Sequence, residues 1–93
     1  MKLDTLLHQE LRLAIVSFLA NDIEWASFNA LIEVTESTKG NLSVQLKKLE
    51  AADYIKIKKR FKNNYPLTEC RLTETGKEAL QNYIQELRKM LNI

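Results

Sequence analysis

The residues of this sequence best suited to chemistry are amides, hydroxyls and lysines gathered between positions 38 and 48. Asparagine and glutamine side chains can hydrogen-bond base edges, valine can contact a thymine methyl group, and lysine neutralises phosphate. We interpret Asn41, Val44 and Gln45 as candidate base contacts, and Lys47 and Lys48 as candidate phosphate contacts. The complete candidate set in this segment is Thr38, Lys39, Gly40, Asn41, Ser43, Val44, Gln45, Lys47 and Lys48. The pattern favours recognition of a nucleic acid.

Groups for catalysis and metal binding are scarce. The chain contains one histidine, His8, and one cysteine, Cys70, which are far apart and lack the spacing of a zinc site. The sequence has no glycine-rich phosphate loop and no Ser/His/Asp or Cys/His set. We therefore expect neither enzyme activity nor a metal or cofactor. A redox role for Cys70 would require a low thiol pKa.

Basic residues are concentrated in the middle of the chain. Residues 1–36 carry two basic and six acidic groups, residues 37–72 carry nine and three, and residues 73–93 carry three of each. Such a segment is typical of a surface that faces phosphates, and the alternative is a solvated lysine-rich face. The 93 residues are enough for one domain, spanning 1–93. Since neither a signal peptide nor a membrane span is evident, we expect a cytoplasmic protein.

Apolar periodicity predicts a mainly α-helical chain with one small β-hairpin, an α+β fold. Apolar residues recurring at spacings of three and four predict amphipathic helices, and a near-alternation of apolar and basic residues predicts the hairpin. The predicted helices span about 4–20, 27–33, 38–52 and 73–91, and the hairpin spans about 54–72. In the third helix Leu42, Leu46 and Leu49 share one face, which we expect to be buried. The polar candidates then lie on the opposite, open face.

The hairpin adds further basic candidates. Lys59, Arg60 and Lys62 lie on its first strand and can reach phosphates from there. At the tip we expect Asn63 to adopt the positive φ that a tight turn needs. Before the hairpin we expect Asp53 to end the third helix in a left-handed conformation. These features predict a basic hairpin that follows the third helix in the chain.

The run GNLSVQLKKLEAADYIKIKKRFKNNYPLTECRLTETGKEAL, Gly40 to Leu80, resembles the winged helix-turn-helix regulators related to the MarR and ArsR groups, most closely their small single-domain branch. In that branch the third helix reads approximately GNLSxHLKKLEEAGYI, and LTxxG opens the last helix. The resemblance implies a winged helix-turn-helix fold, in which the third helix enters the major groove and the hairpin contacts the flanking backbone. The tip departs from the family, since glycine and arginines are replaced there by Asn63, Asn64, Tyr65 and Leu67. We therefore expect no minor-groove reading by the tip.

The first and last predicted helices carry longer apolar stripes than a three-helix core requires. In the resembling family these helices pair across a two-fold axis, so the resemblance implies a homodimer. The predicted interface residues are Leu3, Leu7, Leu11, Leu80, Tyr83, Ile84, Leu87 and Leu91. The alternative is that these stripes pack within one chain.

Together these features predict a sequence-specific double-stranded DNA-binding transcriptional regulator. We favour a repressor that binds an inverted repeat as a dimer, because so small a domain leaves no room for an activation surface. The alternative is a winged-helix protein interaction module with weak or no DNA binding, which the missing arginines at the tip favour. A small-molecule effector at the dimer interface is compatible with the first hypothesis, and the wider resemblance implies phenolic or aromatic ligands.

Overall fold

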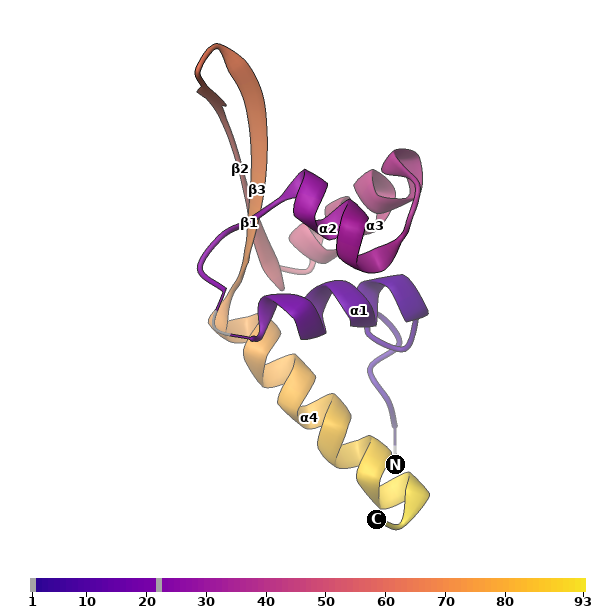
Figure 1. Ribbon diagram of the computed structural model, residues 1–93. Helices are drawn as coiled ribbons and strands as arrows, with labels where there is room; N and C mark the ends of the chain where they lie inside the picture. Colours follow the sequence, from indigo (N-terminus) through magenta and orange to yellow (C-terminus); the bar gives the residue numbers. More distant parts are fainter. Residues whose placement is uncertain (1, 22) are drawn as a thin grey trace.

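Four helices and a three-stranded antiparallel sheet make up the part of the chain, residues 2–21 and 23–93, that the computed structural model describes. The elements are, in order, α1 (Glu10–Leu19), β1 (Ala26–Ser27), α2 (Phe28–Thr35), α3 (Lys39–Ala51), β2 (Ile55–Lys62), β3 (Tyr65–Leu72) and α4 (Glu74–Leu91). Figure 1 shows the β2–β3 hairpin, the wing, rising above the helices, and α4 running out below α1. The molecule is therefore elongated, 51 × 25 × 22 Å. The predicted α+β winged helix-turn-helix fold is confirmed.

Helix α1 begins at Glu10, six residues later than the predicted start. The Asp4 carboxylate accepts hydrogen bonds from the amides of Leu6 and Leu7, at 2.8 and 3.2 Å, and so caps a separate turn. Gln9 then adopts an extended backbone conformation and its side chain caps α1 by accepting from the Arg12 amide at 2.7 Å. The prediction of one helix from residue 4 was wrong because two polar side chains compete for the backbone amides of this segment.

Three hydroxyl side chains define the starts of the other helices. Ser27 caps α2, Thr38 caps α3 and Thr73 caps α4, each by accepting a hydrogen bond from the amide three residues later. These caps satisfy amides that have no partner within the helix. The observed bounds of α2, α3 and α4 accordingly lie within two residues of the predicted ones.

The wing is a regular hairpin closed by a two-residue turn. Strands β2 and β3 pair from Ile55↔Leu72 to Lys62↔Tyr65. Asn63 and Asn64 have φ values of 53° and 66°, and positive φ at both central residues is typical of a type I′ turn. The expectation for Asn63 is confirmed, as is that for Asp53, whose φ is 62°.

The sheet has a third strand that the sequence pattern did not reveal. Strand β1 pairs with the outer side of β3 through Ala26↔Cys70 and Ser27↔Glu69. Two residues are too few to produce a visible alternation of apolar and polar side chains. The strand ties the start of α2 to the base of the wing.

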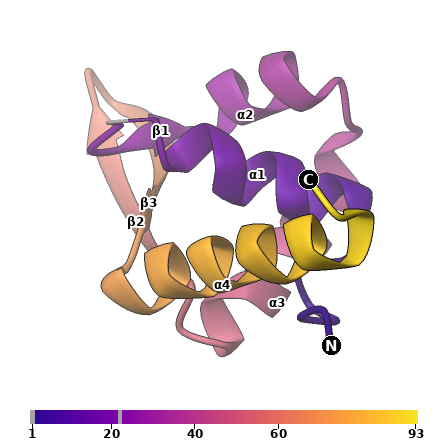
Figure 2. The same cartoon turned by 90° about the horizontal axis from the view of Figure 1, so that it is seen from below.

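The core lies where α1, α2 and α3 meet the base of the wing and the first half of α4. Leu42, Leu46 and Leu49 are at most 3% exposed, which confirms that this face of α3 is turned inward. The buried core consists of Leu7, Leu11, Ile15, Val16, Leu19, Ala26, Leu31, Leu42, Leu46, Leu49, Ile55, Cys70, Leu72, Leu80 and Tyr83. Seen from below, α4 lies in front of α3 and next to α1 (Figure 2). None of the described helices is both long and apolar enough to cross a membrane.

Candidate nucleic-acid interface

The outward face of α3 is polar, basic and open. With the leucines buried, Thr38, Lys39, Gly40, Asn41, Val44, Lys47 and Lys48 are all exposed. Val44, at the centre of this face, is 49% exposed, so its apolar side chain is not part of the hydrophobic core. Gly40 has open space around it, because a Cβ built there would have no neighbour within 4 Å. This face of α3 is therefore accessible to another molecule.

A crevice of about 560 Å³ separates α3 from the wing. Lys47 of α3 and Lys59 of β2 both line this crevice. Two hydroxyl-bearing residues, Ser43 and Thr68, line it as well. Glu50 is the acidic member of the lining. The two lysines on facing elements outnumber this one carboxylate, so the lining carries a net positive charge that attracts anions such as phosphate.

The basic residues of the wing divide between its two faces. Side chains alternate along a strand, so Lys59 shares the face of Ile57 and Phe61 that looks toward α3. Arg60 and Lys62 lie on the other face, where Arg60 forms an ion pair with Glu69 at 3.0 Å. Lys58 on that outer face lies 4.2 Å from the centre of the Trp25 ring. The three wing candidates therefore do not form one surface.

Gln45 is buried, contrary to the prediction that it reads bases. Its side chain is 8% exposed, on the flank of α3 that faces α1. Its Oε1 accepts a hydrogen bond from Arg12 Nη1 at 2.5 Å, and its Nε2 donates to Asn41 Oδ1 at 3.0 Å. A buried amide with both ends bonded has no free edge for a base, so we remove Gln45 from the candidate base contacts. Arg12 was missed because a basic residue on a partly buried helix carries no signal of its partner.

Half of the predicted dimer interface belongs to the core of one chain. Leu7, Leu11, Leu80 and Tyr83 are at most 8% exposed, so they cannot also cover a second subunit. Tyr83 additionally shares a 3.0 Å hydrogen bond with His8 Nδ1. The remaining candidates are more accessible: Leu3 and Leu87 are half-buried, Ile84 is 42% exposed and Leu91 is 56% exposed.

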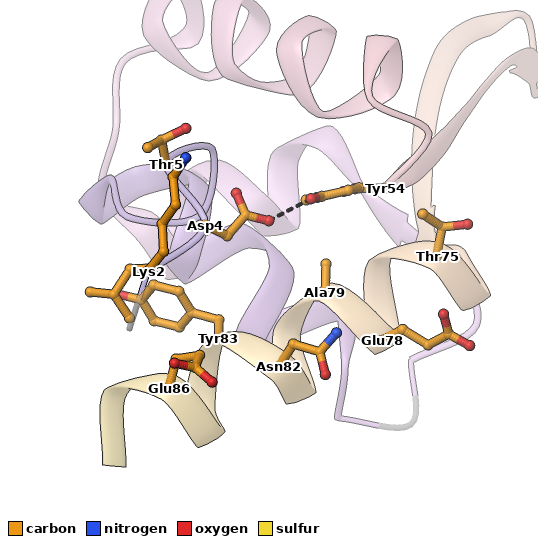
Figure 3. Close-up of a pocket in the computed structure, with 11 residues that line it drawn as sticks. Lys2, Asp4, Thr5, Tyr54, Thr75, Glu78, Ala79, Asn82, Tyr83 and Glu86 are labelled. Carbon is orange, nitrogen blue, oxygen red and sulfur yellow. Dashed lines mark hydrogen bonds between the residues drawn. The ribbon is translucent and has the colours of Figure 1, made fainter. Parts of the chain in front are cut away.

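A second cavity, of about 550 Å³, lies between the N-terminal segment and α4 (Figure 3). Its wall includes Asp4 and Tyr54, whose hydroxyl donates to Asp4 Oδ2 at 2.5 Å. Burial, the hydrogen bond to Asp4 and the negative charge of Asp4 raise the pKa of Tyr54 to about 12. This bond ties the N-terminal segment to the residue that precedes the wing.

Cys70 is packed in the hydrophobic core, and His8 shares its hydrogen bond with Tyr83. The Cys70 thiol is fully buried, and burial, together with the charges of Glu50 and Glu69, raises its pKa to about 11. A protonated, inaccessible thiol reacts slowly with oxidants and electrophiles. Within residues 2–21 and 23–93, no group of three or more His, Cys, Asp and Glu side chains is placed to hold a metal ion.

Comparison with known proteins agrees with this fold. A family model described as a winged helix DNA-binding domain matches residues 11–91. An uncharacterised protein of Methanocaldococcus jannaschii is 35% identical over 68 residues, which are 73% of this chain and 74% of that protein. The structure of a transcriptional regulator homologue from Pyrococcus horikoshii OT3 is similar, with a TM-score of 0.85, 26% identity, and coverage of 94% of this chain and 85% of that one.

A possible transcriptional regulator from Methanosarcina mazei Go1 shares the fold, with a TM-score of 0.64, 15% identity, and coverage of 94% of this chain and 76% of that one. The family match spans α1 to the end of α4, and so includes the open face of α3, the crevice and the wing. The chain belongs to the winged helix DNA-binding domain family.

Proposed function

We propose that this protein is a transcriptional regulator, acting as a repressor, that binds an inverted repeat in duplex DNA as a homodimer. The observation that supports this most directly is the open polar face of α3 beside a crevice with a lysine on each wall, Lys47 and Lys59. The major groove of DNA is wide enough for an α-helix, and the crevice beside α3 can then receive the neighbouring DNA backbone. The likeness to a transcriptional regulator homologue from Pyrococcus horikoshii supports the regulatory role.

The exposed residues divide by chemistry into two groups. Asn41 and Val44 lie on the open face of α3 and are the candidates for contacts to base edges. Lys39, Lys47, Lys48 and Lys59 are exposed and carry the charge that neutralises phosphates. Phosphate contacts position the protein on the duplex, whereas base contacts give it sequence preference.

The dimer is proposed to form through α4. Ile84, Leu87 and Leu91 follow at spacings of four or three along one side of the helix, and Ile84 and Leu91 are about half exposed. The lower half of α4 extends beyond the helical body, where a second copy can reach it (Figure 1). A two-fold pairing of this seam would present two α3 helices to the same side of DNA, about 34 Å apart for adjacent half-sites.

Titration of a labelled duplex from the region upstream of the protein's own gene, at several salt concentrations, tests the proposal. Four lysine contacts in each subunit predict that log K falls with log salt with a slope of about −7. Lys47→Ala should reduce the slope by about 2 in the dimer. Lys89→Ala is the matched control, because Lys89 lies on α4 and pairs with Glu86, and it should leave the slope unchanged.

Two results would count against the proposal. Absence of duplex binding even at low salt would favour a protein interaction module. Binding with equal affinity to upstream and scrambled duplexes would leave DNA binding in place but exclude sequence-specific regulation.

A further inference from the structure

Three polar side chains form a hydrogen-bonded chain from α1 to the open face of α3. Arg12 Nη1 donates to Gln45 Oε1 at 2.5 Å, and Gln45 Nε2 donates to Asn41 Oδ1 at 3.0 Å. Arg12 is held in turn by its Nε, which donates to the carbonyl oxygen of Leu6 at 2.6 Å. Arg12 is half-buried, Gln45 is buried and Asn41 is exposed. The chain thus connects the interior of the domain to a side chain on the surface proposed to contact DNA.

Arg12 sets the direction of the whole chain. A guanidinium group has only donors and keeps its proton, so Gln45 has to turn its carbonyl oxygen toward Arg12. The amino group of Gln45 then faces Asn41, which has to offer its own carbonyl oxygen. The opposite orientation of either amide would place a donor against a donor. The amino group of Asn41, Nδ2, is left without a hydrogen-bond partner within residues 2–21 and 23–93.

We propose that Arg12 is a positioning residue for DNA recognition, because it orients Asn41 so that this side chain presents hydrogen-bond donors to the major groove. A base with acceptors on that edge is then preferred, and guanine, with N7 and O6 side by side, fits best. The inference rests on the proposed DNA-binding function. This preference differs from the usual pairing of an asparagine side chain with adenine.

Pairing with adenine would require Asn41 to use its oxygen and its amino group together. The oxygen already accepts from Gln45 Nε2 with one of its two lone pairs, so rotating it away from Gln45 to meet a base would leave a buried donor without a partner. A buried unpaired donor is costly, so the interior of the domain opposes that arrangement. Arg12, which is linked to the DNA only through Gln45 and Asn41, therefore determines the selectivity at this base.

Gln45→Glu tests the proposal because it nearly preserves the shape of the side chain but reverses the direction of its hydrogen bond with Asn41. A carboxylate still accepts from Arg12, but it has no donor for Asn41. Asn41 would then turn its amino group inward and its oxygen outward. The preferred base at the contacted position should change from guanine to cytosine or adenine, whose major-groove edges carry amino donors. We expect the ratio of the dissociation constant for the guanine site to that for the adenine or cytosine site to change about fivefold or more.

The measurement begins with enrichment of randomised duplexes by the wild-type protein. Fluorescence anisotropy then gives the dissociation constant of each single-base-pair variant of the enriched site. The position read by Asn41 is the one at which Asn41→Ala removes the preference. Arg12→Met should relax the preference at the same position, whereas Arg88→Met, which removes the same charge from the exposed end of α4, should not.

Side-chain amide NMR on the free protein provides a readout that needs no DNA. The proposal requires a Gln45 amino group that exchanges slowly with solvent and an Asn41 amino group that exchanges fast. The reverse would overturn it whether or not DNA binds. If the wild-type protein selects a site but Gln45→Glu keeps the same base preference, the inference fails and the proposed function stands. If the wild-type protein binds no duplex, the proposed function and the inference fail together.

Discussion

Of the two glycines, Gly76 in the LTETG run is the one at which an added methyl group should destabilise the fold. A Cβ built there would lie 2.2 Å from the carbonyl oxygen of Tyr54 and 2.6 Å from Leu72 Cδ1. The leucine methyl can rotate away, but the carbonyl belongs to the backbone. That oxygen also accepts hydrogen bonds from the amide and the hydroxyl of Thr73, at 3.0 and 3.1 Å. The start of α4 is thus packed directly on the residue that precedes the wing.

Gly76→Ala is therefore expected to lower the free energy of unfolding by about 3 kcal/mol. Overpacking of a rigid site costs about 1–3 kcal/mol, and each weakened hydrogen bond about 0.5–1.5 kcal/mol. The higher helix propensity of alanine returns up to about 1 kcal/mol. Urea denaturation followed by circular dichroism measures the change, which should appear as a lower midpoint at unchanged m-value.

Gly40→Ala is the matched control, because it makes the same change at a helical glycine with no neighbour within 4 Å. It should raise the free energy of unfolding by up to about 1 kcal/mol, since alanine restricts the unfolded chain more than glycine. A loss of duplex affinity in this variant would then report close approach of α3 to the DNA. The steric reasoning is refuted if Gly76→Ala lies within about 0.5 kcal/mol of the wild type or if both variants lose stability equally.

Three further outcomes are expected. Native Cys70, with its raised pKa and full burial, should resist iodoacetamide at pH 8 and react only after denaturation, so rapid labelling of the folded protein would contradict its surroundings. The free energy of unfolding should fall as the pH rises from about 9 toward 12, because Cys70 and Tyr54 hold their protons more tightly when folded than when unfolded; a level profile over this range in urea denaturation would argue against this. Ile84→Glu should convert a dimer to a monomer in light scattering, whereas Gln85→Glu, exposed on another side of α4, should not; identical masses for both would reject the α4 seam.

Local patterns in the sequence were sufficient for most of the elements. The predicted starts of α2, α3 and α4 agree with the observed caps Ser27, Thr38 and Thr73, because a capping side chain acts on amides only three residues away. The leucines of α3 predict its buried face because side chains three and four residues apart lie on the same side of a helix. Asp53 and Asn63 take the positive φ expected of them for equally local reasons. Where the sequence misled, at the start of α1, two competing caps lay within the same ten residues.

The site depended on partners that are distant in the sequence. Gln45 has the residue type of a base contact, yet Arg12, thirty-three positions earlier, holds it inside the domain. Lys59 and Arg60 are neighbours in sequence, but strand pairing places them on opposite faces of the wing. The stripe of α4 divides in the same way, since Tyr83 is buried and Ile84, the next residue, is exposed.

The amino-acid sequence by itself determined the presence of the four helices and the hairpin, and which side of α3 is apolar, because these depend on spacing along one element. Only the tertiary structure decided which polar side chains remain available to a partner, because burial and hydrogen bonding depend on which elements come together in space. A side chain can bind another molecule only with the atoms that its own fold has left free.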